Sequence, residues 1–377
     1  MAVYISLTVA AMAFALLVKK NEVSYADNYH PPIHRGMTRR QMVNVISCII
    51  IFTMLFVVSA IRLNVGNDYL NYVEFMHLVY YNAYVPTEAG FNALTYLIYA
   101  LCGFENYLLV FACFSFATVY FFMKGIYRQS EWFTMSFALF MLLGYYFQSL
   151  STVRYYLALG MALYSIKYVI SKDWPRFVFI VIVASLFHKS ALVVLLLYGL
   201  AQLNWKRWMY LLLLTAGVSC LFLSDIYLKI VVFLYPSYEN TEYLSGGTSV
   251  ANIVRCAAVL AFSLWLYRDN IQNNRTYKFY FVCNVMALVL YVFGSFLPVI
   301  SRIGYYLNVT QILFIPALLK CIKDDRKYKL AVAAVTIISV IYFAMYMKGA
   351  ADDGVRILPY QTFMFHDLPL TLSERGY

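Results

Sequence analysis

Four arginines stand at places where long apolar segments of the sequence begin or end. They are Arg62, Arg154, Arg255 and Arg302. The planar guanidinium group presents its donors as a fork that matches two oxygens of a phosphate, which lysine cannot do. An arginine at a membrane boundary can instead extend its charge to the lipid headgroups, and this alternative holds for each residue taken alone. Four arginines in equivalent positions indicate an anionic, phosphate-bearing ligand.

Two short stretches contain groups that could move a proton. Asp68 follows Gly66 and Asn67, which are typical of a turn, and it could orient Arg62 or deprotonate an attacking hydroxyl group. A carboxylate among arginines needs burial to remain basic. His188, in the stretch FHKSA, is the other candidate base because imidazole titrates near neutral pH. The alternatives are a solvated loop for Asp68 and a hydrogen-bonded packing role for His188.

Tyrosines accompany these charged residues. The candidates for substrate binding are Arg62, Arg255, Tyr69, Tyr72, Tyr155, Tyr305 and Tyr306. Phenol rings within about a helical turn of an arginine could stack on the faces of a sugar while the arginine holds a phosphate. Tyrosines that anchor a protein at the membrane surface would give the same pattern, so both interpretations stay open.

The composition limits the kind of fold that positions these residues. Of 377 residues, 63% are hydrophobic and 12% are charged, and the mean hydropathy is +0.69. Apolar runs fall at about 1–18, 43–61, 105–123, 132–148, 151–170, 177–203, 209–224, 250–267, 279–297, 303–319 and 330–347. The sequence predicts an all-α, polytopic transmembrane helical bundle of about 11–13 membrane segments. A single integral membrane domain is expected to span 1–377.

The distribution of charge predicts which links face the cytoplasm. Lysines and arginines gather in alternate links, as the positive-inside trend requires, so the net charge of +11 reflects topology and no nucleic acid is expected as a partner. The links 62–90 and 225–249 are predicted external loops, and Glu88 lies in the first of them. The run 177–203 has basic links on both sides, which indicates two short paired helices with His188 near their outer apex. One long tilted helix is the alternative.

Two further stretches of sequence bear on the chemistry. The segment 91–101 is too short, and too close to the apolar run 105–123, to form a further membrane crossing. This predicts an interfacial or re-entrant helix. The seven cysteines occur singly, and the sequence contains no zinc-binding or other metal-binding motif and no nucleotide-binding motif. We therefore expect a metal-independent protein without a cofactor.

Four motifs in order along the chain resemble the EpsG family of exopolysaccharide polymerases. They are Arg62 followed by VGNDYLNY, TVRYYLALGMALYSIKYV with Arg154, ASLFHKSALV with His188 and ISRIGYYL with Arg302. The resemblance covers residues from about 40 to 320. It departs at Asn67, where Thr or Ser would be usual. The family is similar in role to the Wzy polymerases of O-antigen and capsule pathways.

The resemblance implies a membrane glycosyltransferase that joins undecaprenyl-diphosphate-linked repeat units on the outer face of the bacterial inner membrane. Arg154 and Arg302 would then stabilise the leaving diphosphate, and Arg62 and Arg255 would bind the second diphosphate or the acceptor. His188 or Asp68 would act as the general base. A glycan ligase of the same pathway and a lipid-linked oligosaccharide flippase or transporter are the alternatives, and a chain-length regulator is a conceivable further partner beside the lipid bilayer.

Overall fold

The computed structural model describes residues 1–19, 38–234, 249–266, 270–295, 300–352 and 354–368. Within these residues the regular structure is helical, apart from an isolated bridge pair between Arg62 and Thr362. This confirms the predicted all-α class. The part of the predicted loop 225–249 at 235–248 lies outside the described residues.

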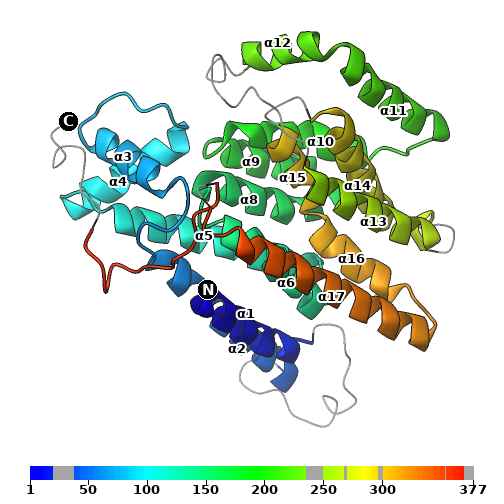
Figure 1. The fold of residues 1–377 in the computed structure, drawn as a ribbon, viewed down its shortest axis with the longest axis horizontal. Coiled ribbons are helices and arrows are strands. Elements are labelled where there is room, and N and C mark those ends of the chain that lie inside the picture. Colours follow the sequence, from blue (N-terminus) through cyan, green and yellow to red (C-terminus); the bar gives the residue numbers. More distant parts are fainter. Residues whose placement is uncertain (20–37, 235–248, 267–269, 296–299, 353, 369–377) are drawn as a thin grey trace.

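The helices follow one another along the chain (Figure 1) as α1 (Ala2–Leu17), α2 (Arg39–Ala60), α3 (Tyr69–Tyr80), α4 (Ala89–Cys102), α5 (Tyr107–Gln129), α6 (Phe133–Leu142), α7 (Tyr145–Gln148), α8 (Val153–Ile170), α9 (Trp174–Ser185), the 3₁₀ turn η2 (Lys189–Leu192), α10 (Val193–Ala201), α11 (Arg207–Phe222), α12 (Ser224–Leu234), α13 (Val250–Trp265), α14 (Arg275–Phe293), α15 (Ile300–Asn308), α16 (Gln311–Lys320) and α17 (Asp325–Lys348).

Length and hydropathy mark four of these helices as able to cross a membrane. They are α2, α5, α14 and α17, and shorter apolar helices accompany them. The most apolar windows of α5 and α14 are 56% buried, whereas that of α17 is only 17% buried. Between its charged ends, α17 exposes apolar side chains such as Leu330, Ile338 and Met345, which suits contact with lipid rather than water. The chain is a polytopic membrane protein.

The centre of the bundle is the packing of α8 between α5 and α9 (Figure 1). A Cβ atom on Gly160 of α8 would lie 3.0 Å from the ring of Phe122 on α5, so glycine permits this close approach. Polar residues at helix starts fix the ends of the elements. Thr38 and Gln41 form a capping box before α2, and Asn106 caps α5.

Two predicted runs are interrupted in the structure. The run 132–148 is divided into α6 and α7 because Gly144 adopts a left-handed φ of +81°. The run 303–319 is divided into α15 and α16 after Asn308. The Thr310 hydroxyl group donates to the backbone carbonyl of Leu307, and the Asn308 side chain donates to Asn252 on α13 and Tyr291 on α14. Each of these two apolar runs therefore contains two helices.

Short helices also occur where the sequence indicated other structure. The run 177–203 forms α9 and then η2 with α10, and these pack on each other, so the prediction of paired short helices is confirmed. Segment 91–101 lies within α4. The predicted external loop 62–90 contains α3, and residues 225–234 of the other predicted loop belong to α12. The apolar runs did not reveal α3 because Asn71, Glu74 and His77 interrupt its apolar residues.

Candidate functional site

Arg154 lies in the first turn of α8, where a carboxylate and two aromatic rings surround its guanidinium group. Its Nη1 donates to Oε2 of Glu88, the residue that precedes α4. The guanidinium carbon lies 5.4 Å from the centre of the Tyr72 ring and 5.5 Å from that of Phe91. The second carboxylate oxygen of Glu88 accepts a hydrogen bond of 3.2 Å from the backbone N–H of Lys189. Glu88 therefore joins the start of α8 to the turn at η2.

Asp68 and His188 lie in the electrostatic field of Arg302 and Arg154. Burial raises the pKa of the Asp68 carboxyl group, and the charges of Arg302 and then Arg154 oppose that rise. His188 lies in the turn between α9 and η2, where burial first and then Arg302 and Arg154 hold the pKa of its imidazole well below the usual range. The imidazole is therefore neutral at pH 7. The structure brings these four predicted catalytic residues into one electrostatic environment from α8, α15 and two loops.

Hydrogen bonds and ring contacts with Ser190 and Tyr155 position His188 and Arg302. His188 Nδ1 and Ser190 Oγ lie 2.6 Å apart, and the same Oγ lies 3.1 Å from the hydroxyl oxygen of Tyr306. The Tyr155 hydroxyl group donates to the backbone carbonyl of Arg302 over 2.6 Å, and its ring meets the His188 ring edge-on with centres 5.2 Å apart. Tyr155 and Tyr306 are both buried, so they support the site rather than present open ring faces.

Arg62 has a different set of partners, which we call the Arg62 enclosure. Its Nη1 donates to the backbone carbonyl of Ser59 and lies 3.2 Å from Ser59 Oγ and 3.3 Å from Ser115 Oγ. Its guanidinium carbon lies 5.0 Å from the ring centre of Phe111 and 6.0 Å from that of Tyr69. Arg62 is 1% exposed, and Tyr69 is equally buried. Substrate binding by these two residues stays a prediction that their burial does not favour.

Arg255, on α13, belongs to a second group of tyrosines. Its Nη2 donates to Asn252 Oδ1 over 3.0 Å, and its guanidinium carbon lies 5.8 Å from the Tyr145 ring centre and 6.0 Å from that of Tyr342. The Tyr305 ring meets Tyr145 edge-on at 6.1 Å. Nε and Nη1 of Arg255 are buried and make no hydrogen bond with the described residues. Nε and Nη2 of Arg62 share this property.

The C-terminal segment after α17 holds the loop that leads to Asp68. The Leu63 N–H donates to the Gln361 carbonyl over 2.9 Å, and the Gly66 N–H donates to the Arg356 carbonyl over 2.8 Å. The Arg356 guanidinium group also donates to Asn64 Oδ1 over 3.2 Å. Residues nearly 300 positions apart along the chain thus form one structure around the Asp68 loop.

The opposite side of the same loop rests on the turn before α8. Gly66 has a φ of +108°, and a Cβ atom there would lie 2.4 Å from the carbonyl oxygen of Leu150. The Asn67 N–H donates to Ser151 Oγ over 3.0 Å. Only glycine suits both the conformation and the approach. Asp68 is therefore fixed relative to the turn that carries Arg154.

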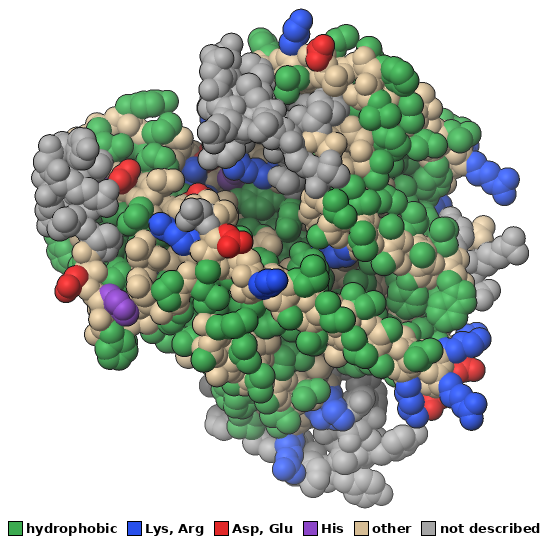
Figure 2. Space-filling model, in the orientation of Figure 1, with side chains coloured by type: hydrophobic (Ala, Val, Ile, Leu, Met, Phe, Trp, Pro, Cys, Tyr) green, Lys and Arg blue, Asp and Glu red, His purple; other side chains and the backbone are tan. Residues whose placement is uncertain are grey.

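The face seen in Figure 2 has a recess near its centre, with Lys and Arg side chains around it and acidic and His side chains close by. Several residues that contact the arginines or His188 were not given a role from the sequence. Glu88 was named only as part of the predicted external loop 62–90, and Ser190 and Asn252 had no predicted role. Ser190 could have been noticed because it follows His188 by two residues in a polar break within an apolar run.

Comparison with known proteins gives one match. A family model described as the EpsG family matches residues 45–362. No curated protein and no solved structure matches the chain. The match begins within α2 and ends in the C-terminal segment that holds the Asp68 loop, so it includes the whole arginine site. The chain belongs to the EpsG family.

Proposed function

We propose that this chain is a membrane glycosyltransferase that joins lipid-linked oligosaccharide repeat units into a polysaccharide. Membership of the EpsG family points to polysaccharide biosynthesis. The observation that carries the finer proposal is the convergence of Arg154 and Arg302 on Asp68 and His188. Two cations beside a proton acceptor suit a reaction in which a diphosphate leaves and a hydroxyl group attacks.

In the proposed step, a sugar hydroxyl of one repeat unit attacks the anomeric carbon at the reducing end of the growing chain. A new C–O glycosidic bond forms while the bond between that carbon and the lipid diphosphate breaks. The hydroxyl proton passes to a base on the protein, and the diphosphate leaves with the bonding electron pair. Undecaprenyl diphosphate is the proposed carrier, and the outer face of the bacterial inner membrane is the proposed location.

Arg154 and Arg302 are proposed to stabilise the charge that develops on the leaving diphosphate. Arg154 suits this role because Glu88 fixes its Nη1 while its Nε makes no hydrogen bond with the described residues. A preorganised donor of this kind is worth about 3 kcal/mol of barrier. The arginines supply the positive charge, so no metal ion or cofactor enters the proposed step. The free nitrogens of Arg255 support a role in holding the second diphosphate or the acceptor.

The two candidate bases differ in basicity. Burial raises the pKa of Asp68, and this makes its carboxylate a stronger proton acceptor than an exposed one. The pKa of His188 is lowered, so its neutral ring is a weak acceptor. A bound diphosphate would offset the charges of Arg302 and Arg154 and raise both values. These shifts favour Asp68 as the base and His188 as a hydrogen-bonding residue for the sugar or the diphosphate.

Deleting the gene and complementing it with wild-type or R154A protein tests the proposal. We expect single lipid-linked repeat units to accumulate on the outer leaflet of the deletion strain, with the polymer absent, and only wild-type protein should restore the polymer. Gel electrophoresis and mass spectrometry of lipid-linked glycans provide the measurement, and immunoblots control for protein level.

Other outcomes identify the other candidate functions. Repeat units trapped on the inner leaflet would identify a flippase. Finished polymer that accumulates on its lipid without reaching a final acceptor would identify a ligase. Unchanged glycans would contradict a role in this pathway.

A further inference from the structure

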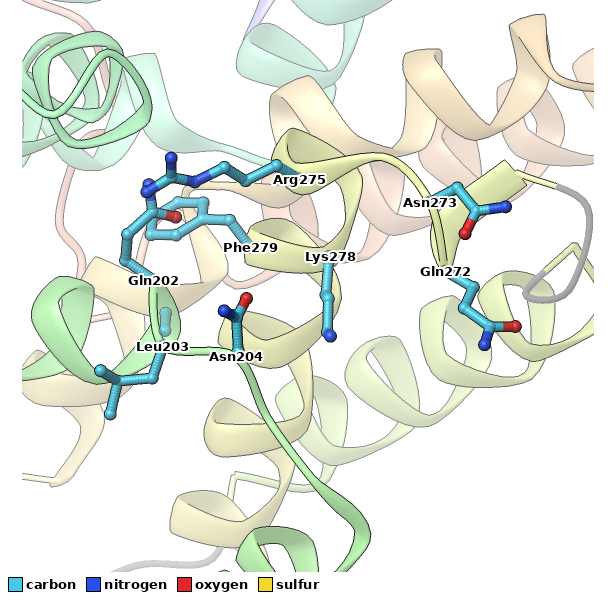
Figure 3. Close-up of a pocket in the computed structure, with 9 residues that line it drawn as sticks. Gln202, Leu203, Asn204, Gln272, Asn273, Arg275, Lys278 and Phe279 are labelled. Atoms are coloured by element: carbon cyan, nitrogen blue, oxygen red, sulfur yellow. The ribbon is translucent and has the colours of Figure 1, made fainter.

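A polar cavity lies at the other end of the bundle from the arginine site, between the link after α10 and the start of α14 (Figure 3). Its volume is about 190 Å³. It is lined by Ala201, Gln202, Leu203, Asn204, Gln272, Asn273, Arg275, Lys278 and Phe279. Apart from Ala201, Leu203 and Phe279, every lining residue carries a polar or cationic side chain.

The chemistry of the cavity is that of an anion site. Arg275 and Lys278 are one helical turn apart on α14, and Figure 3 shows the guanidinium group of Arg275 near Gln202 and the ammonium group of Lys278 extending beside Asn204. The segments 201–209 and 267–279 together contain five basic residues and one acidic residue, Asp269, which lies outside the described residues. A phosphate placed between the two cations could also accept hydrogen bonds from side-chain amides.

The N-terminus of α14 does not itself provide this site. The side chain of Asn274 already accepts hydrogen bonds from the backbone N–H groups of Thr276 and Tyr277, over 3.0 Å and 3.2 Å. The donors in the cavity are therefore the side chains of Arg275, Lys278 and the amide residues, of which Gln202 already donates one N–H of its Nε2 to the Val169 carbonyl over 2.9 Å.

Two tryptophans place the cavity at the level of the lipid headgroups. Trp205 donates its Nε1–H to the carbonyl of Leu200 over 2.8 Å, and Trp208 is 57% exposed at the start of α11. Tryptophan is enriched at the membrane–water boundary, where one edge of its ring is wet. The basic residues beside it match the trend for the cytoplasmic side, whose leaflet is rich in anionic lipids.

We propose that this cavity binds the phosphate group of an anionic phospholipid in the adjacent leaflet. Arg275 and Lys278 would hold the phosphate, and Gln202 and Asn204 would bond to its oxygens or to the polar headgroup. The acyl chains would then lie against the exposed apolar side chains of α11, among them Leu211 and Leu212. The proposal is independent of the glycosyltransferase reaction, because the site shares no residue with it.

Lipid retention by the full-length protein tests the proposal. The purified protein in detergent is mixed with equal amounts of phosphatidylglycerol and phosphatidylcholine, and bound lipid is measured by native mass spectrometry. We expect selective retention of phosphatidylglycerol and a loss of roughly tenfold in its affinity for R275Q/K278Q. The control is R326Q/K327Q, which removes the same charge from exposed residues at the start of α17 and should behave as wild type.

Three outcomes would overturn the proposal. Equal loss in both double variants would mean that the attraction comes from diffuse surface charge. Equal retention of the two lipids by wild-type protein would mean that the cavity does not select an anionic headgroup. Displacement of phosphatidylglycerol by millimolar inorganic phosphate would identify a free anion as the ligand. Thermal unfolding of each variant checks that the bundle is intact.

Discussion

Arg154 and Arg62 both lie at helix ends, but their surroundings differ in kind. The side chain of Arg154 is 17% exposed, pairs with the carboxylate of Glu88 and shares its electrostatic field with Asp68 and His188. Arg62 is 1% exposed and meets neutral hydroxyl groups, a carbonyl oxygen and aromatic rings. The partners and the access to solvent, rather than residue type and position along the chain, therefore distinguish Arg154, which is proposed to bind an anion, from Arg62, which is packed in the interior.

Removing a guanidinium group from the site that contains Arg154, Arg302, Asp68 and His188, which we call the exposed site, should have the largest effect on the rate of polymerisation. We expect R154A and R302A each to slow polymerisation by about 100- to 1,000-fold, because each removes a preorganised donor for the leaving diphosphate. The measurement is the rate at which purified protein in liposomes extends synthetic lipid-linked repeat units.

Lysine provides the matched control at both positions. R154K keeps the charge but not the two-point fork, so it should recover only part of the rate. Alanine variants that polymerise at the wild-type rate would remove the distinction between the two kinds of arginine.

The variant D68N tests whether the Asp68 carboxylate supports the reaction while it lowers the stability of the fold. As the proposed base, D68N should lose roughly 100-fold or more in rate. Its raised pKa means that folding disfavours the ionised carboxylate, so D68N should unfold at a higher temperature at pH 7. This gain should shrink as the pH falls through the raised pKa of the folded carboxyl group, and it should be absent below the pKa of the unfolded one, because both states are then protonated.

The exposed Asp225 on α12 gives the control for charge removal. D225N should change neither the rate nor the unfolding temperature. If D68N lowered the unfolding temperature at pH 7, the carboxylate would be a net stabilising partner of Arg302 rather than a strained base.

Gly66 tests the loop that joins the two regions, since it lies between Arg62 and Asp68. G66A should destabilise the fold by about 1–3 kcal/mol, because alanine disfavours a φ of +108° and its Cβ would meet the Leu150 carbonyl. Gly103 has a φ of +78° but no atom near its Cβ position, so G103A measures the conformational cost alone. Equal unfolding temperatures for the two variants would show that the close approach contributes nothing.

The sequence predicted the membrane class and the candidate residues but not their grouping. Composition and apolar runs are enough for an all-α bundle, and the polar break at His188 and Lys189 revealed the paired short helices. The division of the arginines into an exposed site and an enclosure depends on tertiary contacts such as that between Glu88 and Arg154. Local periodicity carries no information about such contacts.

The same reasoning explains the interrupted helices and the C-terminal segment. A left-handed glycine at position 144 looks in sequence like any tolerated glycine in an apolar run. The contact of Arg356 with the loop near Asn64 joins residues from opposite ends of the chain, and neither stretch is apolar enough to suggest a partner.

Replacing Arg62 should have the smallest effect on the reaction itself. R62M keeps much of the side-chain length and can fill the space beside Phe111 and Tyr69, while it removes the donors to Ser59 and Ser115. Hydrogen bonds from a charged group typically stabilise by about 1.5–3 kcal/mol, and removal of a buried charge offsets part of that loss. We expect a lower unfolding temperature but a rate per folded molecule within about threefold of wild type, because the enclosure does not touch the proposed reacting groups. Rates normalised to the folded fraction provide the measurement, with S115A as a milder change in the same enclosure. A fall in normalised rate comparable to that of R154A, without a change in unfolding temperature, would mean that the enclosure opens during the reaction and that Arg62 reaches the substrate.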